Sequence, residues 1–183
     1  MINWLLGDPL IACDEWSGNA SWDAEGVIIP VQRGVTFDGA TGLTRRFFDW
    51  AKLEKQPSGF YRVIFLMQEA TRYILSLDIE PGKAYPFVRL FGSDDLYRTV
   101  IFACDGEVNT PAKIEDIEAC YQSALAVCLD QGITNVAVPL LGDEQLINMD
   151  KVASAARRVF LRADVNASVF LTQHLMSKVL ARR

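Results

Sequence analysis

Apolar positions along this chain follow two different patterns, and the two patterns alternate. Continuous apolar runs, such as "GVIIPV" at 26–31 and "NVAVPLL" at 135–141, are typical of strands that are covered on both faces. Between them, apolar residues from Phe60 to Leu77 recur at steps of three and four, which predicts a helix over 58–78 despite its β-branched residues. Strands that alternate with helices predict a layered α/β fold.

The remaining elements follow from the same patterns. The most clearly marked helix spans 110–132, where Thr110 is expected to cap the helix, Pro111 suits its first turn and Gly132 suits its end. Further strands are expected at 2–7, 84–91, 97–104 and 167–172, and further helices at 43–53, 149–161 and 174–183. These elements predict a single domain over 1–183, a three-layer α/β/α sandwich with a mixed central sheet of about six strands. Residues 27–31 and 136–140 are expected to be central strands.

Charge and hydropathy narrow the function. With 18 basic and 23 acidic residues the net charge is −5, which argues against a general affinity for nucleic acid. No stretch approaches the ~18 continuous apolar residues of a membrane span. The amino terminus has no basic segment and soon meets Asp8 and Pro9, so we expect no signal peptide and a cytoplasmic protein.

Cysteine and histidine give no sign of a metal centre. The four cysteines include no C-x-x-C pair, and a reduced cytosolic chain explains them better than disulfides do. His174 is the single histidine, so neither a mixed Cys and His zinc site nor a histidine-dependent triad is expected. We therefore predict no metal and no cofactor.

Several local motifs occur in an order that points to one family. The long segment "CYQSALAVCLDQGITNVAVPLLG" joins a helix to a strand of the form I-x-x-[IV]-A-x-P, and "AARRVF" and "ASVFLT" follow it. "YRTVIFACDG" precedes that helix, whereas "GDPL", "GVIIPVQRG" and "GATGLTRRF" lie near the amino terminus. Together these motifs resemble the macro domain, the fold known for binding ADP-ribose, over nearly the whole chain.

The resemblance implies a cleft between two loops, residues 32–42 and 142–148, that holds ADP-ribose or a related nucleotide or sugar phosphate. Both loops follow predicted strands, and ligands of open α/β sheets bind at the carboxyl ends of strands. The family's pattern assigns Asp8 to the adenine amino group and Gln32 to the distal ribose. The other ligand-binding residues that it implies are Gly39, Gly42 and Leu43 in the first loop, and Gly142, Asp143 and Glu144 in the second.

Departures from the family pattern affect both loops. The family's "NAAN" becomes "IPVQ", in which Gln32 carries its amide one methylene further out and Pro30 lacks a backbone donor. The diphosphate loop becomes "GDEQLI", which keeps Gly142 alone. Two carboxylates beside a diphosphate oppose its binding, at about 1 kcal/mol for an exposed like-charge pair about 6 Å apart.

Three functions remain open from the sequence. The first is a module that binds ADP-ribose, and the second is a hydrolase of that fold with Asp38 as the candidate general base. An aspartate before glycine is more often a turn or cap residue, and Phe37 packs in a core more often than it stacks on a ligand. The third is a domain that kept the fold, lost the ligand and works through a protein partner. The altered loops make the binding module and the hydrolase less favoured. They count most against the hydrolase, because catalysis needs acid and base groups within hydrogen-bond reach.

Overall fold

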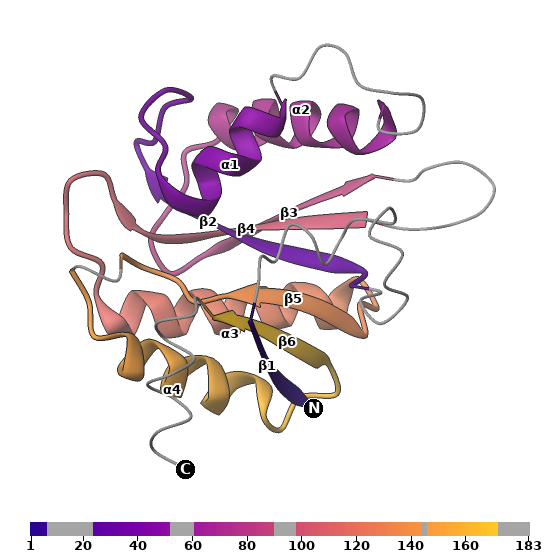
Figure 1. The fold of residues 1–183 in the computed structure, drawn as a ribbon, viewed down its shortest axis with the longest axis vertical. Helices are drawn as coiled ribbons and strands as arrows, with labels where there is room; N and C mark the ends of the chain where they lie inside the picture. Colours follow the sequence, from indigo (N-terminus) through magenta and orange to yellow (C-terminus); the bar gives the residue numbers. More distant parts are fainter. Residues whose placement is uncertain (7–23, 52–60, 90–97, 144–145, 172–183) are drawn as a thin grey trace.

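The computed structural model describes residues 1–6, 24–51, 61–89, 98–143 and 146–171. These residues form six strands and four helices (Figure 1). The strands are β1 (Ile2–Leu6), β2 (Gly26–Arg33), β3 (Ala84–Arg89), β4 (Arg98–Glu107), β5 (Asn135–Pro139) and β6 (Asn166–Leu171). The helices are α1 (Gly42–Ala51), α2 (Tyr61–Ser76), α3 (Ile114–Asp130) and α4 (Met149–Phe160).

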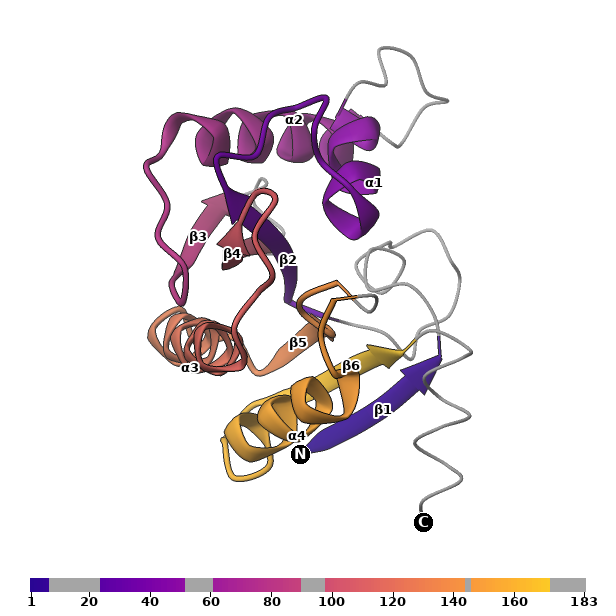
Figure 2. The same ribbon diagram turned by 90° about the vertical axis from the view of Figure 1, so that its left-hand side faces the viewer.

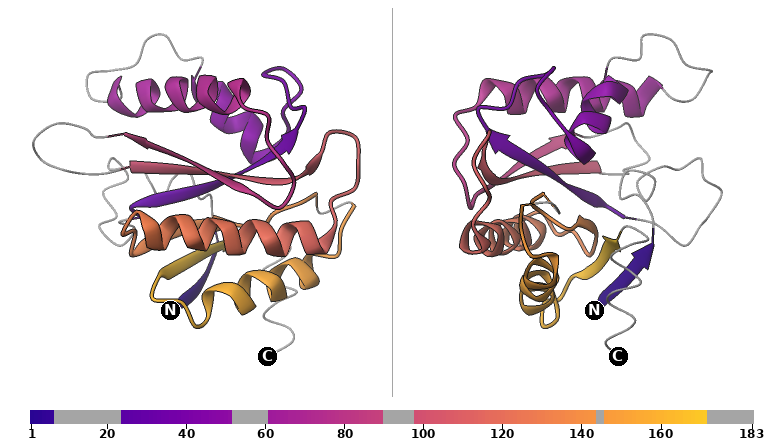
Figure 3. Two further views of the ribbon diagram at one scale, coloured as in Figure 1. Left: turned by 180° about the vertical axis from the view of Figure 1, so that it is seen from behind. Right: turned by 60° about the vertical axis from the view of Figure 1, so that its left-hand side comes forward.

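All six strands belong to one mixed sheet, as the sequence predicted. Their order is β1-β6-β5-β2-β4-β3, and only β3 is antiparallel to its neighbour. The two apolar runs are therefore the two central strands, β5 and β2. Helices α1 and α2 cover one face of the sheet and α3 and α4 cover the other, which gives the three layers (Figure 2 and Figure 3).

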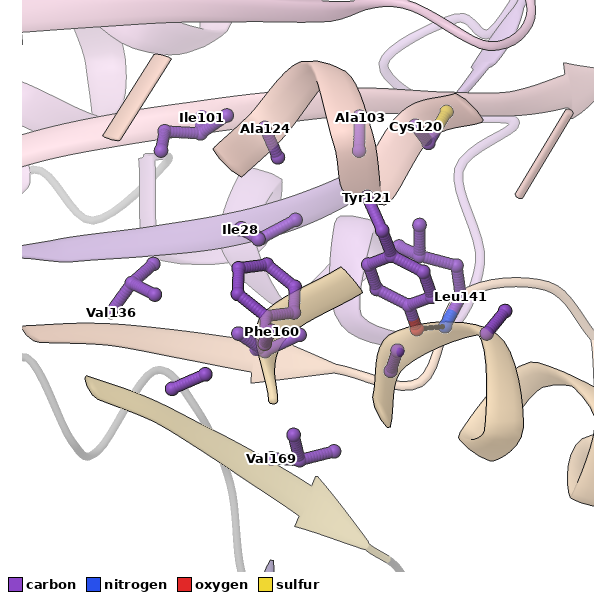
Figure 4. Close-up of a cluster of buried hydrophobic side chains, with 14 of the residues drawn as sticks. Ile28, Ile101, Ala103, Cys120, Tyr121, Ala124, Val136, Leu141, Phe160 and Val169 are labelled. Atoms are coloured by element: carbon purple, nitrogen blue, oxygen red, sulfur yellow. Dashed lines mark hydrogen bonds between the residues drawn. The ribbon is translucent and has the colours of Figure 1, made fainter. Parts of the chain in front are cut away.

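Covering both faces explains why the central strands are apolar without alternation. Successive side chains of a strand point to opposite faces, so Ile28 packs with α3 and α4 whereas Ile29 packs with α1 and α2. On the first side Tyr121 lies edge-on to Phe160, with ring centroids 6.1 Å apart, at the centre of the apolar cluster in Figure 4. On the other side Phe47 meets Phe102 of the sheet at 5.6 Å.

The helix predicted from the three-and-four spacing is confirmed as α2, and it packs against α1 and β3. The predicted start of α3 was wrong. The helix begins at Ile114 with Lys113 as its N-cap residue and without a side-chain cap. Residues before it are held in a turn instead, because the amide of Thr110 donates to Glu107 and that of Val108 donates to Arg33.

The predicted end of α3 is confirmed. Gly132 has a φ of 67°, a left-handed conformation that favours glycine, and the amide of Ile133 reaches back to the carbonyl of Cys128 at 2.8 Å. None of the helices in the described ranges is long and apolar enough to span a membrane. The helix predicted at 174–183 lies outside the described residues.

Candidate ligand-binding site

The centre of the sheet opens at its carboxyl edge. Strands β2 and β5 are neighbours, yet their pairing consists of Gly26 with Val136 and Val27 with Ala137, both at the strands' starts. Beyond those pairs the strands diverge, as Figure 1 shows. β2 then leads to α1 on one face of the sheet, and β5 leads to α4 on the other face. Two neighbouring strands whose connections leave to opposite faces are where open α/β sheets form a ligand crevice.

Each of the two diverging strands contains a proline beyond the last β2–β5 pair. Pro30 lies where β2 has already left β5, so its missing N–H removes no hydrogen bond between these strands. The carbonyl of Pro30 accepts a hydrogen bond from the hydroxyl of Thr44, which ties the first turn of α1 to β2. On the other strand the carbonyl of Pro139 accepts from the Tyr121 hydroxyl at 3.0 Å. Side chains from helices on opposite faces thus satisfy carbonyls on both diverging strands.

The loop between β2 and α1 is built by a short turn. The Gly39 amide donates to the Thr36 hydroxyl at 3.1 Å, and a Cβ atom at position 39 would lie only 2.8 Å from that oxygen, so a larger residue would displace the Thr36 hydroxyl from this hydrogen bond. Asp38 is exposed within this turn, and its carbonyl accepts from the Arg45 guanidinium at 3.1 Å. Asp38 is therefore a turn residue, the commoner of its two expected fates.

Phe37 contributes to packing. Its ring lies parallel to that of Phe48, with centroids 5.5 Å apart, and it joins the apolar cluster under α1. Gly42 is the first residue of α1 and has a φ of 56° with open space where a side chain would be. The first turn of α1 contains no acidic residue, so the positive end of this helix is not offset by a carboxylate of its own first turn.

The loop between β5 and α4 uses its backbone amides internally. The Leu141 amide donates to the Tyr121 hydroxyl at 3.0 Å, and the Gly142 amide donates to the Asp105 carboxylate at 2.7 Å (Figure 4 shows the first of these). The amides of Leu146 and Ile147 both donate to the carbonyl of Asp143 at 3.0 Å. A phosphate that approached this loop would find these four amides already engaged.

Gly142 itself is required by the loop. Its φ is 84°, and a Cβ atom there would lie 3.0 Å from Ile147 and 3.1 Å from Ile117. Further along, Asn148 caps α4 by accepting from the amide of Asp150, an acidic residue in the first turn of that helix. The positive end of α4 is thus partly offset by the protein itself, in contrast to that of α1.

Asp105 is a site residue that the sequence reasoning missed. The β2–β4 register shifts here: Val31 pairs with Cys104 and Gln32 with Gly106, so Asp105 is the extra residue of a bulge. It is 4% exposed, and burial raises the pKa of its carboxyl to about 6. One carboxylate oxygen accepts from Gly142, and the other has no hydrogen-bond partner among the residues that the structure describes. The available signal was an aspartate directly after an apolar strand and before glycine, in "FACDG".

A cleft of about 420 Å³ opens beside the first loop. It is lined by residues 32–35 and 74–79 and so lies toward the end of α2. Arg33 lines it and forms ion pairs with Asp78 at 3.2 Å and Glu107 at 3.8 Å. Of the predicted ligand-binding residues, Gln32 belongs to this lining.

The other predicted residues separate into three groups. Gly39, Gly42 and Leu43 lie at the start of α1, and Gly142 and Asp143 follow β5. Asp8 and Glu144 lie outside the described residues. Because β2 and β5 are parallel neighbours, their two loops meet the same edge of the sheet, as the sequence predicted.

Comparison with known proteins agrees with this architecture. The family model described as "Macro domain" matches residues 67–156. This chain is a divergent macro domain. Macro domains are known to bind ADP-ribose. Among curated proteins, no relative of this macro domain matched.

Solved structures share the fold of this macro domain at low sequence identity. The macrodomain of Mycobacterium tuberculosis DarG is 21% identical, with a TM-score of 0.62, over 93% of this chain and 97% of that one. Thermosipho africanus DarTG in complex with ADP-ribose is 17% identical at a TM-score of 0.61, over 82% of this chain and 39% of that one. A mutant of the Oceanobacillus iheyensis macrodomain with ADPR is 12% identical at a TM-score of 0.60, over 98% of this chain and 93% of that one.

Proposed function

We propose that this macro domain binds ADP-ribose, or a related nucleotide or sugar phosphate, at the carboxyl edge of β2 and β5. The observation that carries the proposal is the divergence of these two central strands after Val27 and Ala137, with connections that leave to opposite faces. That topology supports a crevice between residues 32–42 and 142–148. Two of the similar solved structures contain ADP-ribose, which supports the choice of ligand.

Within this proposal the diphosphate lies against the start of α1. Backbone amides at a helix start and the positive end of the helix dipole bind anions, and no carboxylate in the first turn of α1 opposes them. Gly42 and Leu43 then supply the backbone closest to the phosphates. Gln32, at the end of β2, supplies the amide for a ribose hydroxyl. Asp8 remains the candidate for adenine.

The second loop makes binding weaker than an unmodified phosphate loop would. Four of its amides donate to Tyr121, Asp105 and the carbonyl of Asp143, so they are engaged before any ligand arrives. Asp143 and Glu144 add negative charge beside the diphosphate. The same engaged amides favour a second candidate function, in which the fold has lost its ligand and works through a protein partner.

Calorimetry with ADP-ribose, ADP, NAD and ATP distinguishes the two candidates. The binding proposal expects heat and saturation with ADP-ribose, and the protein-contact alternative expects none with any of the four. The test of location is Gly42→Glu, which puts a carboxylate at the start of α1 and should abolish binding.

Gly132→Glu is the matched control for that variant. Gly132 also has a positive φ, 67° against 56° for Gly42, and also has open space around it, but it lies at the end of α3. Both variants therefore carry a similar backbone strain of about 1–2 kcal/mol. Loss of binding in Gly42→Glu alone supports the site, and equal binding in both variants places the ligand elsewhere.

A further inference from the structure

The residue of most interest beyond the predicted site is Asp105, which lies beneath the second loop. It reaches the loop from β4, two strands away from β5 in the sheet. The bulge at Val31 and Gln32 makes it an extra residue between the Val31–Cys104 and Gln32–Gly106 pairs of the β2–β4 ladder. Its contact with the Gly142 amide joins β4, the neighbour of β2, to the loop that follows β5.

This buried carboxylate has few hydrogen bonds and ion pairs to stabilise its negative charge. A buried ionised carboxylate is normally paired with a cation or accepts several hydrogen bonds. Asp105 accepts from Gly142 through one oxygen at 2.7 Å, and its own backbone N–H also favours the carboxylate, but among the described residues the other, buried oxygen has no geometric hydrogen-bond partner. Within the described part of the chain, no lysine or arginine forms an ion pair with it.

The titratable groups around Asp105 do not compensate its charge. Cys120 and Tyr121 of α3 and Cys104 of its own strand interact with it, and all three are neutral because burial raises their pKa values. The cation that acts on the neighbouring Cys104 is Arg33 of β2, which pairs with Asp78 and Glu107. On the other sides the groups are acidic: Asp116 on α3 acts on Cys120, and Asp143 follows Gly142 in the loop.

We propose that Asp105 is a specificity-determining residue of the ligand loop, whose buried negative charge beneath Gly142 makes a diphosphate in the crevice bind more tightly when the carboxylate takes up a proton. The inference rests on the proposed function, because it concerns the ligand expected at that loop. The proton comes from solvent and is taken up by the carboxylate oxygen that does not bind Gly142. The neutral carboxyl keeps a carbonyl oxygen that accepts from Gly142, so the loop keeps its conformation.

Burial and a bound anion both raise the pKa of Asp105, and together they set the direction of the change in affinity with pH. Burial already raises the pKa of Asp105 to about 6, and a bound anion raises it further because it disfavours the carboxylate. If the diphosphate raises it by about one further unit, affinity increases about tenfold between about pH 8 and about pH 5. The diphosphate of ADP-ribose keeps its charge over that range, so the ligand does not cause the change.

The experiment is calorimetric titration with ADP-ribose at about pH 5, 6, 7 and 8, on the natural protein and on Asp105→Asn. Asparagine keeps the size and the acceptor for Gly142 without the charge. We expect the natural protein to gain affinity about tenfold as the pH falls. We expect Asp105→Asn to bind at every pH about as tightly as the natural protein does at the lowest pH, with less than about a twofold change.

His174→Gln is the control, because histidine is the side chain type whose ordinary pKa lies in this pH range and His174 is the single histidine of the chain. It should keep the pH response of the natural protein. A second measurement needs no variant: at about pH 7, titration in buffers of different ionisation enthalpy should show a net uptake of protons on binding. This measurement decides the question if Asp105→Asn does not fold.

The outcomes separate this inference from the proposed function. ADP-ribose binding that is equally strong at all pH values, or a pH response that Asp105→Asn retains, overturns the role of Asp105 and leaves the proposed function standing. Binding weakened equally at every pH in Asp105→Asn shows a purely structural residue and also overturns it. No binding by either protein at any pH contradicts the proposed function and this inference with it.

Discussion

Replacing Asp105 with asparagine should stabilise the protein at neutral pH, although it removes a charged hydrogen bond. The natural residue is a buried carboxyl whose pKa is raised to about 6 by burial, above the ordinary value of 3.8. Folding therefore favours its protonated form. The stability that this group contributes is fully present below about pH 4 and is lost as the pH rises through about 6.

The magnitude follows from the shift. A difference of about two pKa units corresponds to about 3 kcal/mol between the neutral and ionised forms in the folded protein. The asparagine of the variant would resemble the neutral form, since it keeps an acceptor for Gly142 and carries no charge. At about pH 8 the variant should be more stable than the natural protein by up to about 3 kcal/mol, and near pH 4 the difference should approach zero.

Chemical denaturation at a series of pH values measures this difference directly. Other carboxylates, such as Glu118, whose pKa is lowered by its hydrogen bond to Arg158, affect both proteins equally and cancel in the comparison. For a protein of this size the expected gain at about pH 8 corresponds to roughly 6–12 °C in Tm. A natural protein that is more stable than the variant at every pH would show that Asp105 is compensated in the folded state, and the reasoning would be wrong.

Two further predictions concern the second loop. Tyr121→Phe should lower the free energy of unfolding by about 2–4 kcal/mol, because the buried hydroxyl donates to the Pro139 carbonyl and accepts from the Leu141 amide. The control, Tyr85→Phe, loses one hydrogen bond from the Glu80 amide at the surface and should lower it by under about 1 kcal/mol. Equal losses in the two variants would refute the role of burial. Replacing both Asp143 and Glu144 with glycine should tighten ADP-ribose binding, and the gain in affinity should shrink in high salt if the loop is exposed. Tighter binding by the natural protein that depends on added magnesium would instead indicate a metal-assisted site.

Much of the architecture was predictable because it depends on local pattern. The apolar runs that became β2 and β5, the stripe that became α2 and the glycine that ends α3 each have a signal within their own segment. The start of α3 was not predictable in this way. Thr110 and Pro111 suit a helix start locally. However, Arg33, which belongs to the sequence-distant strand β2, accepts a hydrogen bond from the Val108 amide through its carbonyl and so holds the chain in a turn.

The meeting of the two loops at one edge of the sheet was predictable, and the hydrogen bonds within the second loop were less so. Parallel order and glycine content indicated which loops meet at the sheet edge. What the amides of the second loop do depends on Tyr121 and Asp105, which lie 20 and 37 residues away from the amides they bind. A bulge that turns Asp105 under the loop arises from pairing between two strands, so no single segment of sequence encodes it.

The central claim is that ADP-ribose binds at the carboxyl edge between β2 and β5. Titration of ADP-ribose into isotope-labelled protein, followed by the backbone amide signals, tests it most directly. The account predicts saturable shifts at residues 39–43 and 140–143 and little change at residues 74–79, which line the neighbouring cleft. Signals that stay in place throughout, or that move at 74–79 while those of both loops stay fixed, would contradict it.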